Sequence, residues 1–210
     1  MKQTGMDTNR MVLHGRITQD PIPSHSNHEV EFFTFPLAVS RLSGVCDLVN
    51  VMAPKQLLQE AGWPRQDDPL TVRGELRTFN NRTGVGSRLV ISVFAKELAL
   101  EEGEDENRLL LSGTLCKPPT LRSTPLGRSI CDMILASNRR YGRADYLPCI
   151  AWGSLAHRCG QMAVGESLCL EGRLQSRIYT KHFDDRSEER TAFEVSVMNL
   201  LPPDMVTWAG

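Results

Sequence analysis

The sequence lacks an excess of either charge. Its 210 residues include 24 Lys+Arg and 25 Asp+Glu, for a formal net charge of −1 at pH 7. A chain that binds a polyanion through its overall charge is usually basic, so the composition excludes that mode. A local patch of basic side chains can still act, because the screening length at physiological salt is about 8 Å.

Long apolar runs and leader-like segments are also missing. No run approaches the length of a membrane span, and the N-terminus has no basic start followed by an apolar segment. We therefore expect a cytoplasmic protein without membrane contact. The six cysteines form no C-x-x-C pair, and we expect them to be reduced and mostly buried.

Patterns for metal binding and catalysis are absent as well. His157 and Cys159 are two positions apart on an expected helix, so they do not share a face. No zinc-type spacing occurs, and the sequence shows neither a nucleophile–base arrangement nor a phosphate-cradling glycine loop. We expect a protein that is not an enzyme and that holds no metal and no cofactor.

What the sequence does contain is a repeat of itself. Residues 9–15 (NRMVLHG) recur as residues 107–113 (NRLLLSG), a shift of 98 positions that also takes Leu76 to Leu174. The shift then grows to 104, where residues 91–93 match residues 195–197, so the second copy has six more residues in its last hairpin. A repeat of this length predicts two tandem domains. We place them at residues 1–100 and 107–210, joined by an acidic linker, 101–106, that reads as a solvated spacer.

The stretch of residues 145–179 reads as a strand, a short helix and a second strand. Residues 146–152 are aromatic and apolar and stop at Gly153. Residues 154–162 form the helix, with Ser154 as its cap. Residues 168–179 form the second strand, in which Gly172 permits a bulge or a bend. This order suits a small barrel of the OB type.

The remaining elements follow the same plan. In the first copy we expect strands over residues 9–18, 31–40, 48–52, 69–78 and 88–98, a helix over 54–61 and a turn at 20–24. In the second copy we expect a first strand near 107–113, a loop at 118–127, a strand over 129–137, a polar last hairpin at 180–190 and a last strand over 191–197. Pro36 favours a sheet edge or a bulge. The predicted fold is all-β: two tandem OB-fold barrels, each with five strands and one short helix.

Several short motifs in the second copy resemble the bacterial single-stranded DNA-binding protein family. They are residues 151–156 (AWGSLA), 164–167 (VGES) and 171–177 (EGRLQSR). The resemblance extends back to residues 107–113, which look like the first strand of the family, and forward to 191–197, which look like the last. It implies an OB fold and binding of single-stranded DNA.

The resemblance also implies a set of site residues. Tyr146, Trp152 and Tyr179 fall where the family places base-stacking rings, and Tyr141 lies in a loop where the family often has another. Basic side chains lie close to these rings in sequence: Arg139, Arg140, Arg143, Arg173, Arg177 and Lys181. Flat rings for unstacked bases and positive charge along the backbone are what a single-strand binder needs. For each ring taken alone, packing in the core is the alternative.

The first copy lacks this set of rings. The residues at its matched positions are Ser43, Leu48, Pro54 and Asn81, although Trp63 and Phe79 lie nearby. Residues 9–100 carry 10 Lys+Arg against 9 Asp+Glu, whereas residues 107–199 carry 13 against 9. Because phosphate contacts dominate affinity for a polyanion, we expect the second copy to be the main binding domain. The first copy is then structural, partner-facing or a binder by a different route.

The resulting prediction is sequence-tolerant binding of single-stranded DNA, in replication, recombination or repair, at the nucleoid. Two alternatives stay open. One is a protein-interaction module of a replication or plasmid-transfer complex, which the first copy favours. The other is RNA binding, because stacking alone does not distinguish the sugar.

The resemblance further predicts a homodimer. Family members commonly place four OB folds around DNA as a homotetramer, so two chains of two barrels would restore four, and two-fold symmetry is the commonest arrangement. The apolar first strands, 9–13 and 107–111, could pair with another copy; the alternative is a monomer whose barrels satisfy each other's edges. Family members typically end in an acidic, phenylalanine-tipped peptide that docks other DNA-processing proteins. This sequence stops shortly after its last strand, so no such docking tail is expected.

Overall fold

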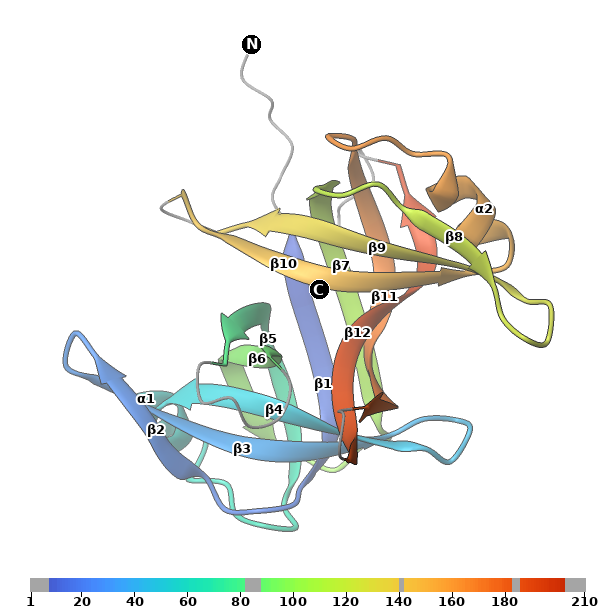
Figure 1. The fold of residues 1–210 in the computed structure, drawn as a ribbon. Coiled ribbons are helices and arrows are strands. Elements are labelled where there is room, and N and C mark those ends of the chain that lie inside the picture. Colours follow the sequence, from blue (N-terminus) through green and yellow to red (C-terminus); the bar gives the residue numbers. More distant parts are fainter. Residues whose placement is uncertain (1–7, 82–87, 140–141, 183–185, 203–210) are drawn as a thin grey trace. The chain divides into compact units, whose positions relative to one another are not determined.

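The computed structural model describes residues 8–81, 88–139, 142–182 and 186–202, and for Lys181 the backbone only. The chain divides into two compact units (Figure 1). One spans Arg10–Arg108; the other runs from Leu109 onward and includes Thr8 and Asn9. Each unit is a small β barrel.

Six strands and one helix make up the described part of the first unit. They are β1 (Asn9–Ile17), β2 (Ile22–Asn27), β3 (Val30–Ser40), β4 (Cys46–Pro54), α1 (Lys55–Glu60), β5 (Pro69–Asn80) and β6 (Leu89–Leu100). The strands lie in the order β2-β3-β4-β6-β5-β1, and the β1–β3 pairing closes the barrel. The β4–β6 pairing is parallel. Five strands, β1, β3, β4, β5 and β6, thus form the closed barrel, and β2 extends it as a hairpin with β3.

The second unit repeats this topology strand for strand. Its described elements are β7 (Glu106–Leu115), β8 (Thr120–Ser123), β9 (Ser129–Asn138), β10 (Ala144–Trp152), α2 (Ser154–Gly160), β11 (Ser167–His182) and β12 (Ser187–Leu201). The order is β7-β11-β12-β10-β9-β8, the β7–β9 pairing closes the barrel, and β10–β12 is the parallel pair. The all-β fold with one short helix per barrel, predicted from the repeat, is confirmed.

Matched apolar residues fill the two barrels, since a strand with one face toward the core buries alternate side chains. Leu13, Leu37 and Leu76 are fully buried in the first unit, and their counterparts Leu111, Leu135 and Leu174 are fully buried in the second. The positions that define the repeat in the sequence are therefore core positions. Their burial explains why the shift of 98 stays constant across most of each barrel.

The sequence-based prediction missed one strand in each copy. The expected turn at residues 20–24 runs into β2, and the expected loop at 118–127 contains β8. Every residue of these two strands is exposed, so neither shows the alternation of apolar and polar residues that marks a strand. The last hairpin expected at 180–190 is present, and its strands are longer than expected, because β11 extends to His182 and β12 begins at Ser187.

Two glycines form bulges at matched places in the barrels. The pairing register shifts between Arg73 and Gly74 in β5 and between Glu171 and Gly172 in β11, which confirms the bulge predicted at Gly172. A Cβ at Gly74 would lie 2.2 Å from the Phe94 carbonyl oxygen, and one at Gly172 would lie 2.6 Å from the Ser196 carbonyl oxygen. Only glycine allows the neighbouring backbone to approach this closely.

Pro36 lies inside a barrel strand at the point where its partner changes. On one side of β3, Thr34 pairs with Ile22 of β2, and Leu37 pairs with Ile17 of β1. The Pro36 carbonyl accepts a hydrogen bond from the Thr18 N–H on this side. A proline lacks the N–H that a continuous ladder needs, and the gap between two partners is where that loss costs least. On its other side β3 pairs with β4 without a register shift, Pro36 opposite Asn50, so the expected sheet edge or bulge at Pro36 is wrong.

The short helix α2 begins without a side-chain cap. Its N-cap is Gly153, with φ of 59°, and no side chain caps the first turn. The prediction that Ser154 caps this helix is therefore wrong. The left-handed backbone at Gly153, which favours glycine, makes the turn from β10 into α2 instead.

Four of the six cysteines lie in the core of the second unit. Cys131, Cys149, Cys159 and Cys169 are buried, whereas Cys46 of the first unit is exposed and Cys116 is half-buried. All six are free thiols. Burial raises the pKa of Cys131 to about 11 and raises the pKa of Cys149 further, because a thiolate is poorly solvated in an apolar core. The expectation of mostly buried thiols is confirmed.

Candidate nucleic-acid interface

Strand β10 presents two of the predicted rings to solvent. Along this strand Leu147, Cys149 and Ala151 are buried, whereas Tyr146 is 54% and Trp152 is 40% exposed. Residues an even number apart share a face of a strand, so both rings lie on the outer face of the barrel, about 20 Å apart along β10. The core alternative is thus excluded for these two rings.

Strand β11 adds a third ring and two arginines. After the bulge, Arg173, Arg177 and Tyr179 share a side of the strand by their spacing and pair with Ser196, Ala192 and Arg190 of β12 in turn. The Arg177 guanidinium carbon lies 6.0 Å from the centre of the Tyr179 ring. That distance is at the outer limit of a cation–π contact. The β11–β12 hairpin therefore brings one predicted ring and one predicted cation together.

The cations on this hairpin are balanced by acidic and amide groups. Arg177 Nε lies 3.5 Å from Glu194 Oε2, and Gln175 Nε2 donates to Glu194 Oε1 at 3.2 Å. Glu194 and Gln175 are both buried. The buried Nε of Arg173 has no hydrogen-bond partner among the described residues. A phosphate approaching Arg177 would have to compete with the carboxylate of Glu194.

Arg122, which the sequence analysis did not single out, lies close enough to Glu194 to interact with its charge. It lies on β8, where its Nε donates to Asp132 Oδ2 at 2.5 Å. The hydrogen bond to Asp132, together with the charges of Asp132 and Glu194, raises the pKa of the Arg122 guanidinium. Arg122 was not predicted as a neighbour of Glu194 because residues 118–127 were expected to form a loop. The pairing of β8 with β9 fixes the position of Arg122.

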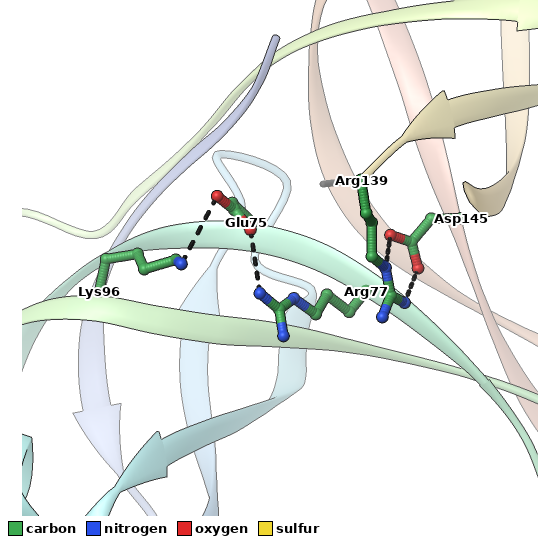
Figure 2. A network of polar contacts seen from close by, with 5 residues as sticks. All are labelled: Glu75, Arg77, Lys96, Arg139 and Asp145. Atoms are coloured by element: carbon green, nitrogen blue, oxygen red, sulfur yellow. Dashed lines mark hydrogen bonds and ion pairs between the residues drawn. The ribbon is translucent and has the colours of Figure 1, made fainter. Parts of the chain in front are cut away.

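Arg139 contacts a carboxylate of its own barrel. Its guanidinium forms a two-pronged ion pair with the carboxylate of Asp145, which is buried (Figure 2). Arg41 and Asp47 form the matching pair in the first unit, with Nε to Oδ2 at 2.7 Å. The pair also occurs in the first barrel, which lacks the predicted rings. We therefore propose that Arg139 holds the β9–β10 turn in place rather than binding a phosphate.

Three predicted site residues lie partly or wholly outside the description. Arg140 and Tyr141 are not among the described residues, and of Lys181 only the backbone in β11 is described. Arg143, at the other end of the same turn, is exposed, and its carbonyl accepts a hydrogen bond from the Arg139 N–H. The structure therefore places seven of the ten predicted residues: Arg139, Arg143, Tyr146, Trp152, Arg173, Arg177 and Tyr179.

The first unit presents apolar or small groups at the matched positions. Leu48, in the place of Tyr146, is 54% exposed, and Pro54, in the place of Trp152, is half-buried. Leu42 and Val45 stand where the second unit has Arg140 and Arg143, and both are exposed. The matched face of this barrel therefore offers no ring and no cation at these positions.

Membrane spans and metal sites define other classes of protein. No helix among the described residues has the length and apolar character needed to cross a membrane. Within the same residues, no group of three or more His, Cys, Asp or Glu side chains is placed to hold a metal ion.

The topology and the surface together define an OB-fold protein with two barrels, the second of which exposes aromatic rings beside arginines. The model of the Single-strand binding protein family matches residues 106–201. The second half of the chain is therefore similar to this family, as its motifs indicate.

Individual relatives give the extent of the likeness. A single-stranded DNA-binding protein of Clostridium tetani is 35% identical over 80 residues, which are 35% of this chain and 55% of the relative. One from Halalkalibacterium halodurans is 33% identical over 99 residues, 44% of this chain and 56% of the relative. The chain thus spans a little over half the length of these relatives. By name both relatives are single-stranded DNA-binding proteins.

A solved structure extends the likeness to both barrels. The wild-type single-stranded DNA binding protein from Thermus aquaticus matches with a TM-score of 0.76 over 97% of each chain, at 23% sequence identity. A match at this identity shows the fold, and it does so for the first unit as well as the second. The predicted tandem arrangement of two OB folds is confirmed.

Proposed function

We propose that this protein binds single-stranded DNA without strong sequence preference, mainly through the outer face of its second barrel. The observation that carries the proposal is the exposure of Tyr146 and Trp152 on one face of β10. A large ring costs free energy when it is left in water, and every base has a flat face that can cover it. The match of residues 106–201 to the model of the Single-strand binding protein family supports the same function.

The mechanism combines stacking with phosphate contacts. Tyr146, Trp152 and Tyr179 take bases, while Arg143, Arg173 and Arg177 follow the phosphate path. Glu194 holds Arg177 at 3.5 Å before DNA arrives, so binding exchanges a carboxylate for a phosphate at that guanidinium. This exchange keeps the arginine oriented and lowers the net gain per contact, which suits sequence-tolerant and reversible binding.

The biological setting follows from this activity. Proteins that cover single strands act in replication, recombination and repair, and we propose that this one works at the nucleoid. An assembly module of a replication or plasmid-transfer complex is the second candidate, favoured by the exposed Leu42, Val45 and Leu48 of the first unit. RNA is tested as a competing ligand with oligouridine, because the 2′-hydroxyl is what distinguishes the two strands.

A salt titration tests the proposal directly. Binding of a dye-labelled oligothymidine, followed by fluorescence anisotropy at several salt concentrations, should weaken with a log–log slope of about −0.7 for each phosphate neutralised. R177Q should make the slope shallower by about 0.7 and lower the affinity. R65Q, which removes an exposed arginine from the first unit, is the matched control. Unchanged affinity and slope in R177Q would remove Arg177 from the phosphate path, and no binding by the unaltered chain would reject the function.

We also propose that the chain forms a homodimer with four OB folds. The apolar first strands no longer support this proposal, because Met11, Leu13, Leu109 and Leu111 are all buried within the single chain. The support is the resemblance and the prevalence of two-fold symmetry. Light scattering at micromolar concentration should give twice the 23.5 kDa mass of one chain. The mass of a single chain would reject the dimer.

A further inference from the structure

The outer face of the first barrel carries a row of aromatic rings that the repeat does not reveal. His25 of β2 stacks on Phe32 of β3, with ring centres 5.0 Å apart and planes 13° from parallel. Phe32 also contacts Phe94 of β6, with centres 5.8 Å apart. The row therefore crosses the barrel from β2 to β6.

These rings are on the outside of the barrel. Phe33 and Phe35, whose side chains point to the opposite face of β3 from Phe32, are buried. The rings of Trp63 and Phe33 meet edge to face, with their centres 5.3 Å apart. His25 at the end of the row is exposed, and Phe32 and Phe94 are half-buried. The row is thus a surface feature, separate from the core.

Two cations lie over the inner end of the row. The Arg77 guanidinium carbon is 3.6 Å and the Lys96 nitrogen is 5.2 Å from the centre of the Phe94 ring. The Glu75 carboxylate forms ion pairs with both cations, 3.3 Å from Arg77 Nη2 and 3.7 Å from Lys96 Nζ (Figure 2). The arrangement matches that of Arg177 and Glu194 in the second barrel: a carboxylate holds a guanidinium beside an aromatic ring.

The row occupies neighbouring strands rather than the repeat positions. Phe32 pairs across the sheet with Pro54, and Pro54 is the residue that stands in the place of Trp152. Phe94 takes the place of Met198, which is exposed and has no ring. The first barrel therefore has a ring on β3, next to the β4 position that corresponds to Trp152 on β10.

We propose that this row, His25, Phe32 and Phe94 with Arg77 and Lys96, is a second site for single-stranded nucleic acid. A base stacks on the open side of the His25–Phe32 pair, and a flanking phosphate displaces Glu75 from Arg77 and Lys96. Parallel rings and cations in one row are the two elements that base stacking and backbone contacts require. A protein partner would use the apolar rings but would leave two cations without an anion. The inference rests on the proposed function and extends it to the first barrel.

The test uses the full chain and removes both flat rings, with apolar bulk kept at position 32. H25A/F32L should lower the affinity for a long oligothymidine about fivefold or more, and should shorten the stretch of DNA occupied per chain by about 4 nucleotides or more. The matched control is I22A/V30A, which trims two exposed apolar residues from the same strands, β2 and β3. R77Q/K96Q should reduce the dependence of binding on salt.

A second measurement on the unaltered chain keeps the inference testable if H25A/F32L does not fold. Irradiation of a complex with a 5-iodouracil-substituted oligothymidine should attach DNA to tryptic fragment 17–41, which contains His25 and Phe32. Attachment confined to fragments of the second barrel, with H25A/F32L binding like the control, would reject this site and leave the proposed function intact. A chain that binds no oligothymidine at all would reject both.

Discussion

Replacing Tyr146 and Trp152 together with alanine is expected to cost about 2–6 kcal/mol of binding free energy for oligothymidine, since each stacked base contributes about 1–3 kcal/mol. Either single change should cost about half as much. Both rings lie on the exposed face of β10, so their removal opens no cavity in the core. The loss should therefore be seen in affinity, measured by anisotropy of a labelled strand, and not in the urea midpoint of unfolding.

The first barrel supplies the matched control for this experiment. L48A/P54A changes the two residues at the corresponding positions, of which Leu48 is equally exposed. It should leave affinity nearly unchanged, because neither residue offers a flat ring. Equal losses in the two double variants, with both folded, would overturn the assignment of the main site to the second barrel.

The second large effect is expected at the ion pair of Arg139 with Asp145. R139M should lower the free energy of unfolding by about 3 kcal/mol, because it leaves a buried carboxylate without its two-pronged partner. Asp145 is fully buried, whereas the Arg139 side chain is 22% exposed. D145N should therefore cost less, since the freed guanidinium can reach water.

Urea unfolding followed by circular dichroism measures this loss. R73M removes one partner of an exposed pair, Arg73 with Glu97 at 3.9 Å, and should change stability by less than about 1 kcal/mol. R139M also separates two roles for this arginine. A positioning role predicts lost stability, whereas a phosphate contact predicts an unchanged urea midpoint with weaker, less salt-dependent DNA binding.

The barrel plan was predictable from the sequence because the core is periodic and repeated. The constant shift that links Leu37 to Leu135 and Leu76 to Leu174 marks residues that are now seen to be buried. Strands β2 and β8 escaped prediction because none of their side chains faces the core. Their existence depends on pairing with β3 and β9, which a local pattern does not encode.

The candidate binding surface was predictable only where family motifs mark it. Tyr146 and Trp152 were found through the family motifs, and their exposure agrees with the predicted role. Phe32 and Phe94 belong to no motif. Their rings come close only in the folded barrel, where β3 and β6 lie on either side of β4. The ion pair of Arg139 was not predictable either, because its proximity in sequence to the rings does not indicate the buried carboxylate that it contacts.

The distribution of cysteines gives the second barrel a chemical reporter of its own. Cys131, Cys149, Cys159 and Cys169 are shielded in that barrel, and their raised pKa values keep the thiols protonated and slow to react. An alkylating reagent therefore modifies them only in molecules whose second barrel has opened. Cys46, exposed in the first barrel, records the intrinsic speed of the reagent in the same tube. Mass spectrometry of one sample can thus follow the opening of the second barrel against an internal reference in the first.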